Sequence, residues 1–499
     1  MILPTDKKPK ILLLSDDLRM HSGIATMSRE IVMGTVRNYD WVQIAGAINH
    51  PDKGKVVSIS DAVRKETGVS DANVILYPND GYGNEDILYA IIDREKPQVI
   101  MHFTDPRFWG WLYAIEKQLR KKYPLTYLNI WDDIPFPMYN KPYYESCDLL
   151  MSISKQTYNI NKHVCGPKNC LTVNDTYVPN KQIIHYVPHG INEKMFKPIA
   201  DDDSMLKKRR LELFRGKDYE YVIFYNSRNV QRKRTSNIVL AYRTFCDNLT
   251  KEQASKCILV LHTEVKCDAG TDLIAVKESL CPDYDIAFSP SKIPPADMTI
   301  IYNIADVTIN LSSNEGFGLS TAESLMSGTP IIATVTGGLQ DQIGQVKDDG
   351  SLIEFTSDFG SNNVGKYKKH GTWVYPIWPA TSYIQGSIPT PYIFDDIAKW
   401  EDAADGMMYW YLMGKEKRDA CGLKGREWAM SDGGINATNM CKQFVNAIDY
   451  TLKNWQPVKQ FGLFSEKDYV GNQMINGLGF RIPTIDKDKI LRKIESINI

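Results

Sequence analysis

The stretch that decides the fold is NEGFGLSTAESLMSGTP, residues 314–330. An apolar, strand-like run (residues 306–311, DVTINL) precedes it, and a helix-like segment (residues 321–326) follows a turn built on Gly316 and Gly318. In a strand–turn–helix unit of this kind, backbone N–H groups and the positive end of a helix dipole point at one place. The stretch therefore predicts an anion-binding turn at the edge of a sheet.

Two carboxylates bracket this turn. Glu315 stands just before it and Glu323 lies inside the helical segment, with seven residues between them. Acceptors at two depths of one cleft suit a ligand with paired hydroxyls, such as a ribose or a sugar ring. Taken alone, a glycine turn near a Glu occurs in many α/β proteins, and Glu323 alone is compatible with an ordinary surface position. Residues 328–330 end the helix, and residues 331–335 (IIATV) predict the next buried parallel strand.

The combination of these residues is more specific than any one of them alone. Glu, seven residues and a second Glu, with Gly-Phe-Gly between them, are followed by Ser-Gly-Thr-Pro and then by Gly337 and Gly338. This pattern resembles the nucleotide-sugar site of the family 4 (group 1) retaining glycosyltransferases. Residues 186–198, YVPHGINEKMFKP, resemble a second segment of that family. The resemblance implies the GT-B fold, an α/β architecture in which two Rossmann-like, doubly wound domains face each other across a cleft.

The rest of the chain fits two such domains. We expect a first, acceptor-side domain at 1–196, a second, nucleotide-sugar-binding domain at 197–455, and a tail at 456–499 that crosses back to the first domain. Residues 346–395 are rich in Gly, Pro and Tyr with little periodicity, and predict a long insertion of the kind that is usually functional or mobile. Strand-like and helix-like segments alternate in the first domain, which favours a mostly parallel sheet. Its predicted strands are 10–15, 41–45, 74–77, 98–103 and 125–130, and its predicted helices are 26–33 and 85–94.

The family resemblance assigns donor contacts to individual residues. Arg228 and Lys233 follow the strand-like run 221–225 (YVIFY) and resemble the family's clamp on the donor diphosphate. Fixed cations there would stabilise the negative charge that the diphosphate gains as the sugar leaves. Where the common family version has Gly after the Lys, this chain has Arg234. The other interpretation of this run is a basic surface loop.

The remaining donor residues follow from the same resemblance. Glu323 would accept hydrogen bonds from the ribose and Glu315 from the sugar. Backbone contacts would come from two glycine loops, one in each domain. The candidates are Gly316, Phe317, Gly318 and Leu319 in the second domain, and Gly23 and Ile24 in the first. Gly23 is nearly as well explained as a plain turn residue.

Asp132 and Asp133 follow the predicted strand 125–130. Residues just beyond the carboxyl end of such a strand face the ligand crevice in open α/β sheets. Relatives often carry a His here, so the Asp pair is a candidate to bind sugar hydroxyls or to act as the base for the acceptor hydroxyl. A helix cap or a plain loop carboxylate explains the pair equally well. Two Asp residues are too few for a metal site. We expect that the protein needs no cofactor and no metal, and that it uses a UDP-sugar as co-substrate.

Composition and sequence patterns argue against several classes of protein. The chain has 499 residues, a net charge of −1 and nine Cys, an odd number that favours reduced thiols. His163, Cys165 and Cys170 lack the spacing of a zinc site. The sequence opens with no signal-peptide pattern and has no apolar run of membrane-spanning length. We expect a soluble, cytoplasmic protein without membrane insertion, in the host cytoplasm if it is viral. The sequence indicates no oligomeric state.

The acceptor is the least defined part of the prediction. The QRKR variant of the clamp and the WVYP and PYI runs resemble glycosyltransferases of T-even-like bacteriophages, some of which modify 5-hydroxymethylcytosine in DNA. The basic runs 120–122, 207–210 and 232–234 could then hold phosphates on either side of a flipped base, if two of them face the cleft. The alternatives are an enzyme of polysaccharide or glycolipid assembly, and a non-catalytic GT-B scaffold that binds nucleotide sugars.

Overall fold

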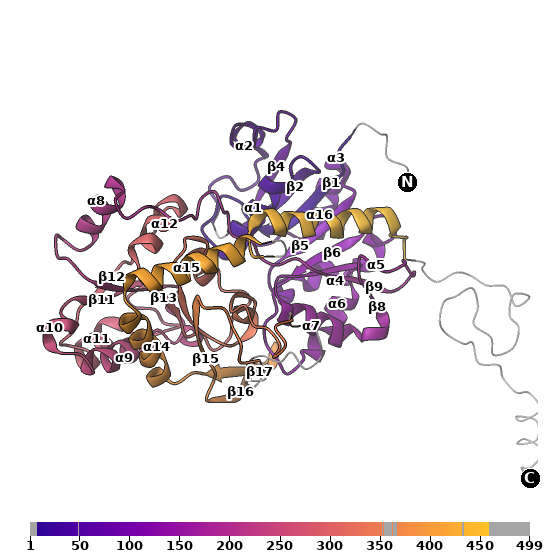
Figure 1. Ribbon diagram of the computed structural model, residues 1–499. Coiled ribbons are helices and arrows are strands. Elements are labelled where there is room, and N and C mark those ends of the chain that lie inside the picture. The colour runs from indigo at the N-terminus through magenta and orange to yellow at the C-terminus, as the bar shows by residue number, and fades with distance from the viewer. Residues whose placement is uncertain are drawn as a thin grey trace, which may run out of the picture.

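The computed structural model describes residues 7–47, 49–351, 353, 362, 367–431 and 434–458. Two α/β domains lie side by side, each built on its own sheet (Figure 1). Within the described residues, no helix is both long and apolar enough to cross a membrane. The two Rossmann-like domains confirm the predicted fold class.

The first domain is built on a nine-stranded sheet with the order β3-β4-β2-β1-β5-β6-β7-β9-β8. Every pairing is parallel except β3 with β4, and the central strands are buried along almost their whole length. Such strands must be covered on both faces, which explains their continuous apolar sequences. The strands are β1 Lys10–Asp16, β2 Asp40–Ala47, β3 Val57–Ser58, β4 Val74–Asp80, β5 Val99–Phe103, β6 Leu125–Asn129, β7 Leu149–Ser152, β8 Cys170–Leu171 and β9 Gln182–Tyr186.

Helices connect these strands, and several begin at a side-chain cap. Ser22 Oγ accepts from Ala25 N at 3.0 Å at the start of α1, and Asn84 and Ser154 do the same for α3 and α7. Such caps satisfy N–H groups that a helix leaves free at its first turn. The helices are α1 Gly23–Thr35, α2 Ser60–Thr67, α3 Glu85–Glu95, η1 Pro106–Trp109, α4 Gly110–Ala114, α5 Glu116–Leu119, η2 Met138–Asn140, α6 Lys141–Glu145, α7 Lys155–Cys165 and η3 Pro167–Asn169.

The second domain is built on a six-stranded, all-parallel sheet with the order β12-β11-β10-β13-β14-β15. Its strands are β10 Tyr221–Asn226, β11 Cys257–His262, β12 Ile286–Phe288, β13 Val307–Asn310, β14 Ile331–Thr334 and β15 Val374–Ile377. Its helices are α8 Ser204–Leu213, η4 Gln231–Lys233, α9 Thr235–Asp247, α10 Lys251–Ala254, α11 Leu273–Leu280, α12 Pro295–Ile304, α13 Leu319–Met326, η5 Gly337–Gln342, α14 Trp400–Met413 and α15 Lys415–Met430.

The strand order places the ligand-binding edge of each sheet. In the first sheet the order reverses between β1 and β5, and in the second between β10 and β13. Ligands of open α/β sheets bind at such switch points, beyond the carboxyl ends of the strands. Residues that follow all four of these strands line one cleft between the domains.

The last helix, α16 Ala437–Asn454, differs from the prediction in its domain. We expected it to end the second domain, with the chain crossing back after residue 455. Instead α16 runs across the first domain (Figure 1), where Phe444 packs on Trp41 with ring centroids 5.8 Å apart. Tyr39 Oη also donates to Asp449 at 2.6 Å. The crossing therefore comes before α16, because the apolar face of this helix completes the first domain's core.

The predicted tail, residues 456–499, lies mostly outside the described part of the chain. Residues 459–499 are outside it, and Val458 N donates to the carbonyl of Arg120, in the first domain, at 3.0 Å.

The predicted long loop at 346–395 is partly regular structure. β15 adds to the sheet of the second domain, and β16 Thr381–Ser387 pairs with β17 Thr390–Ile397 in an antiparallel hairpin. Its strands were missed because the β16 sequence, TSYIQGS, lacks a buried apolar face, and all seven residues of β16 are exposed. Residues 352, 354–361 and 363–366 of this segment are outside the described part of the chain.

Candidate functional site

The cleft between the domains has a volume of about 1730 Å³. The structure brings all of the residues predicted from the sequence into its lining, although they come from both domains. They are Gly23, Ile24, Asp132, Asp133, Arg228, Lys233, Glu315, Gly316, Phe317, Gly318, Leu319 and Glu323.

The predicted anion-binding turn leads into the N-terminus of α13. Gly318 precedes the helix with φ of 90°, a left-handed backbone that favours glycine, and no side chain caps the first turn. Leu319 and Ser320 follow it and line the cleft. Their N–H groups belong to the first turn of the helix, which leaves such donors without intrahelical partners. This end of α13 can therefore bind an anion in the cleft.

A second glycine pair, Gly337 and Gly338, packs against the backbone of the turn. Gly338 N donates to the carbonyl of Glu315 at 2.7 Å. A Cβ atom on Gly338 would lie 2.0 Å from the carbonyl oxygen of Gly316, and one on Gly337 would lie 2.5 Å from that of Glu315. Only glycines allow the two backbones to pack this closely.

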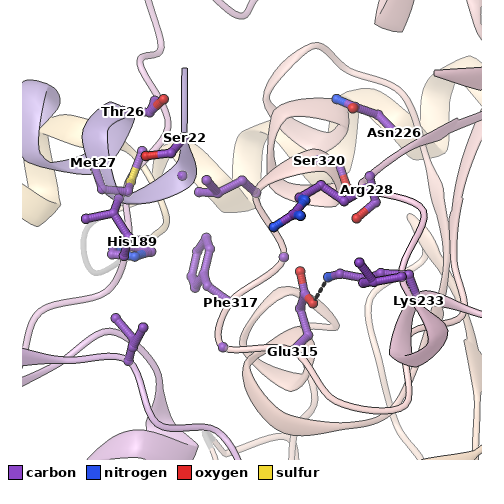
Figure 2. A pocket seen from close by; sticks show the side chains of 18 of the residues that line it. Ser22, Thr26, Met27, His189, Asn226, Arg228, Lys233, Glu315, Phe317 and Ser320 are labelled. Carbon is purple, nitrogen blue, oxygen red and sulfur yellow. Dashed lines mark hydrogen bonds and ion pairs between the residues drawn. The ribbon is translucent and has the colours of Figure 1, made fainter. Parts of the chain in front are cut away.

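Lys233, Glu315 and Arg232 form a charged group on the second-domain wall. Lys233 Nζ forms an ion pair with Glu315 (Figure 2), and Arg232 Nη1 lies 3.1 Å from Glu315 Oε2. Burial would raise the pKa of Glu315, but the charges of Lys233 and Arg232 outweigh it and hold this pKa below its usual value. Burial lowers the pKa of Lys233 to about 8, against the attraction of Glu315. We expected Glu315 at the sugar; here it also orients Lys233.

Arg232 is a cleft residue that the sequence-based site did not include. It stands in the same basic run as Lys233, but the spacing of the family clamp drew attention to Arg228 and Lys233. The available signal was its place between two clamp positions directly after a strand. Arg228 itself is exposed in the cleft near Ser320 (Figure 2), and its guanidinium forms no hydrogen bond or ion pair with the described residues.

Arg234 takes a conformation that suits the glycine of the common family version. Its φ is 53°, in the left-handed region. Its guanidinium donates to Asp395 at 3.2 Å and to Tyr383 Oη at 3.0 Å. The chain thus keeps the backbone of the clamp loop and uses the extra side chain to hold the β16–β17 hairpin.

Glu323 lies one turn into α13 with a defined hydrogen-bond chain. Tyr302 Oη donates to Glu323 Oε2 at 2.7 Å, and Asn226 Nδ2 donates to Tyr302 Oη at 3.0 Å. Burial raises the pKa of Glu323 to about 7, although the Tyr302 hydroxyl favours the ionised form. The carboxylate keeps acceptor capacity toward the cleft.

Asp132 and Asp133 lie on the first-domain wall, after β6. Burial raises the pKa of Asp132, and burial together with the charge of Asp132 raises that of Asp133 well above its usual range. Two adjacent buried carboxyls cannot both ionise easily, so the pair tends to share a proton. Asp133 Oδ1 is buried and accepts no hydrogen bond from the described residues. The pair can therefore hold a hydroxyl group of a ligand.

His189 is a further cleft residue that was not assigned, although it stands in the quoted segment 186–198. It is 5% exposed, and its ring packs edge-on against Phe103 and Phe317, with centroids 5.9 Å and 5.4 Å away. Burial lowers the pKa of His189 to about 3, so the ring is neutral. Its buried Nδ1 has no hydrogen-bond partner among the described residues.

The two glycine loops meet across the cleft. A Cβ atom on Gly23 would lie 3.4 Å from Leu319 Cδ1, so the N-terminus of α1 approaches that of α13. Ile24 lies beside Gly23 in the cleft lining. Two helix N-termini thus open into one space, which increases its affinity for an anion.

Residues 214–359 match the family described as glycosyl transferases group 1. The mannosylfructose-phosphate synthase of Agrobacterium fabrum is 24% identical over 200 residues, which are 39% of this chain and 39% of that protein. The D-inositol 3-phosphate glycosyltransferase of Salinispora arenicola is 28% identical over 186 residues, 35% of this chain and 40% of that protein. The matches thus span about two fifths of the length of these curated relatives.

Solved structures are similar over a larger share of the chain. Anabaena HepE, in complex with UDP and glucose, has a TM-score of 0.58 at 14% identity, covering 88% of this chain and 99% of that one. Sucrose-phosphate synthase from Thermosynechococcus elongatus has a TM-score of 0.59 at 15% identity, covering 90% and 100%. At these identities the likeness shows the fold, and it confirms the GT-B prediction.

Two expectations are untested by these comparisons. The likeness to bacteriophage enzymes stays a prediction, as does independence from a metal. Across the described residues there is no group of three or more His, Cys, Asp or Glu side chains that could hold a metal ion.

Proposed function

We propose that this protein is a retaining glycosyltransferase that moves a sugar from a UDP-sugar to a hydroxyl group of an acceptor. The observation that carries the proposal is the convergence of Arg228, Lys233 and the N-terminus of α13 beside the half-buried Glu323. Cations and free N–H groups bind a diphosphate, and a carboxylate at this depth accepts from ribose hydroxyls. The match to group 1 glycosyl transferases supports the same reaction.

The residues of the cleft lining support a proposed place for each part of the donor. The diphosphate lies at the first turn of α13, between Arg228 and Lys233, and the ribose lies at Glu323. The sugar then extends toward Phe317, His189 and the Asp132–Asp133 pair, on the opposite wall of the cleft. UDP is the expected nucleotide.

The reaction breaks the bond between the anomeric carbon and the diphosphate oxygen. A bond from the acceptor oxygen to the same face of that carbon forms, which retains the anomeric configuration, and the acceptor's proton passes to the leaving diphosphate. Arg228 and Lys233 stabilise the charge that develops on the leaving group. Glu315 is paired with two cations, so it orients the clamp and does not serve as a protein nucleophile.

Basic charge gives little support to DNA with 5-hydroxymethylcytosine as the acceptor. Arg120 is buried and paired with Asp148 and Glu116, and residues 207–210 lie on α8. Neither run lines the cleft, and from the third run only Arg232 and Lys233 do. The condition that two runs face the cleft is not met, so we do not propose DNA as the acceptor.

Calorimetry with UDP, GDP and ADP tests the donor site, and we expect UDP to bind most tightly. Lys233→Ala should lower the rate of sugar transfer by about 100-fold or more, because a buried transition-state cation is lost. Lys208→Ala is the matched control, since Lys208 is an exposed lysine far from the cleft lining. Retention is checked by NMR of the anomeric proton in the product.

Binding decides between the proposal and its main alternative. If none of the three nucleotides binds, the transferase proposal is wrong. If UDP-sugars bind but are neither transferred nor hydrolysed, the protein is a non-catalytic GT-B scaffold.

A further inference from the structure

The β16–β17 hairpin belongs to the second domain but is bonded to the first. Phe394 N donates to the carbonyl of Ile134 at 2.7 Å, and Tyr139 Oη donates to the carbonyl of Tyr392 at 3.0 Å. The rings of Tyr139 and Tyr392 also pack edge-on, with centroids 4.8 Å apart. The hairpin therefore closes one side of the cleft beside the loop that carries Asp132 and Asp133.

A third contact joins the hairpin to η1 of the first domain. Arg107 Nη1 donates to Thr390 Oγ1 at 3.1 Å, and the same guanidinium binds Asp105 through two hydrogen bonds of 2.9 Å and 2.7 Å. Arg107, Asp105 and Thr390 all line the cleft. A fixed guanidinium and a hydroxyl thus face the cleft together.

The base of the hairpin is tied to the donor turn. Asp395 is 2% exposed and accepts from Ser313 Oγ at 3.1 Å and from Asn314 Nδ2 at 3.0 Å. Asn314 directly precedes Glu315. The hairpin is therefore held in register with the donor site and is not a free surface flap.

Only one face of the hairpin looks into the cleft. The side chains of Gln385, Ser387, Thr390, Ile393 and Asp395 line it, together with the backbone of Gly386. Ile384, on the opposite face of β16, is 61% exposed and outside the lining. Strand alternation explains this division, since successive side chains point to opposite faces. The cleft face offers mostly hydrogen-bonding groups.

The first-domain side of the cleft has no arginine or lysine without an ion pair among the described residues. Its arginines are each ion-paired with a carboxylate, at 2.6 to 2.8 Å: Arg19 with Asp17, Arg29 with Glu66, and Arg107 with Asp105. Four other carboxyl groups of this wall form no ion pair within the described part of the chain: Asp16, Glu30, Asp132 and Asp133. A phosphate brought to this wall would meet these carboxyl groups and no cation of the wall that lacks an ion pair, which is unfavourable.

We propose that the β16–β17 hairpin and η1 form the acceptor subsite, and that it selects an uncharged or amine-bearing polyol, such as a sugar or cyclitol, and excludes its phosphorylated form. This inference rests on the proposed function, because it assumes that a donor sugar lies across from the hairpin. Two polar anchors support it besides the charges. Asp133 Oδ1 and His189 Nδ1 are buried at the cleft without a partner among the described residues, and hydroxyl groups can pair with both.

The first test measures UDP release from UDP-glucose with matched acceptors. The probes are myo-inositol, D-fructose and D-glucosamine, each compared with its monophosphate. At least one unphosphorylated probe should raise UDP release above hydrolysis and exceed its phosphate in kcat/KM by about tenfold or more. Preference for the phosphates overturns the inference. So does the absence of any stimulation while UDP still binds. Failure of UDP binding would instead contradict the proposed function.

The second test asks whether the hairpin acts on the acceptor alone. Thr390→Val and Ser387→Ala should each raise the KM of the best acceptor about five- to tenfold, because a hydrogen bond in the subsite is lost. Thr390→Ser, which keeps the hydroxyl group, should have the wild-type KM for this acceptor. The dissociation constant for UDP should stay at its wild-type value. Ile384→Ala, on the outward face of β16, is the matched control. Equal losses in UDP and acceptor binding would place the hairpin in the donor site and overturn the inference.

Discussion

Buried charges dominate the chemistry of individual residues in the cleft. Lys233 and Glu315 compensate each other, and Arg232 adds a second cation to the same carboxylate. Glu323 has no cation and depends on the hydroxyl of Tyr302. A carboxyl group in this environment resists ionisation, because burial disfavours the charged form. Glu323 is therefore expected to destabilise the folded protein at a pH where it is ionised.

The variant Glu323→Gln tests whether the carboxyl group of Glu323 lowers the stability of the folded protein. The pKa of Glu323 is about 7 in the folded protein, against a usual 4.5. Below pH 4.5 both states bind the proton, so the group contributes no pH dependence. Between pH 4.5 and 7 unfolding releases the proton, so stability falls as the pH rises, by about 3 kcal/mol in total. The variant should match the wild type at pH 4 and be more stable at pH 8, by thermal unfolding.

UDP binding gives the complementary readout for the same variant. In the wild type, affinity should rise as the pH increases through 7, because the carboxylate is the better acceptor for two ribose hydroxyls. In Glu323→Gln, calorimetry should show weaker binding with a flat pH profile in this range. A wild-type affinity that is constant from pH 6 to 8 would contradict the assigned role.

At the scale of elements, the site depends on the contact between the donor turn and the loop after β14. The turn and η5 pack backbone on backbone, and Gly338 is the point of closest approach. The geometry of α13's first turn is thus set by a segment that follows it in the chain. Any side chain at Gly338 would push the turn into the cleft.

Gly338→Ala should lower sugar transfer strongly while the protein still folds. The added Cβ would lie 2.0 Å from the carbonyl of Gly316, and relief of such overpacking costs about 1 to 3 kcal/mol. Urea unfolding and UDP calorimetry measure the two effects. Gly110→Ala is the matched control, because φ there is −50° and a Cβ added at Gly110 would meet no atom within 4 Å. Unchanged UDP affinity in Gly338→Ala would show that the turn does not need this contact.

At the scale of the molecule, α16 links the domains. The chain leaves the second domain near residue 435, where Ile191 N donates to the carbonyl of Ile435 at 2.8 Å, and α16 then packs on the first domain. Residues of the 186–198 segment line the cleft, so both chain crossings between the domains lie close together.

Phe444→Ala should remove the main apolar anchor of α16. Phe444 is fully buried between Tyr39 and Trp41, so its truncation should cost about 3 to 5 kcal/mol. Urea unfolding followed by tryptophan fluorescence and by circular dichroism should then show separate transitions for the two domains. Leu412→Ala, at a 73% exposed position, is the control. A single cooperative transition with unchanged midpoint would contradict the linking role.

Local sequence alone predicted most of the elements and the donor wall. The strands β1, β10 and β14 contain continuous apolar runs, which are typical of buried parallel strands. The glycine turn and its two Glu residues are adjacent in the chain, so their spacing already fixes their common place at one strand end. The residues of the donor site therefore lie in the cleft as predicted, although their roles await the measurements above.

Tertiary structure decided what depends on contacts between distant segments. Arg232 became part of the site through Glu315, and His189 through the aromatic rings on both sides of it. The hairpin strands were not predicted from the sequence, because β16 is exposed and needs no apolar alternation, and because the buried residues of β17 are polar, Asp395 and Asp396 among them. The domain of α16 and the balance of charge on the acceptor wall are likewise set by partners far away in the chain, and local periodicity carries no information about such partners.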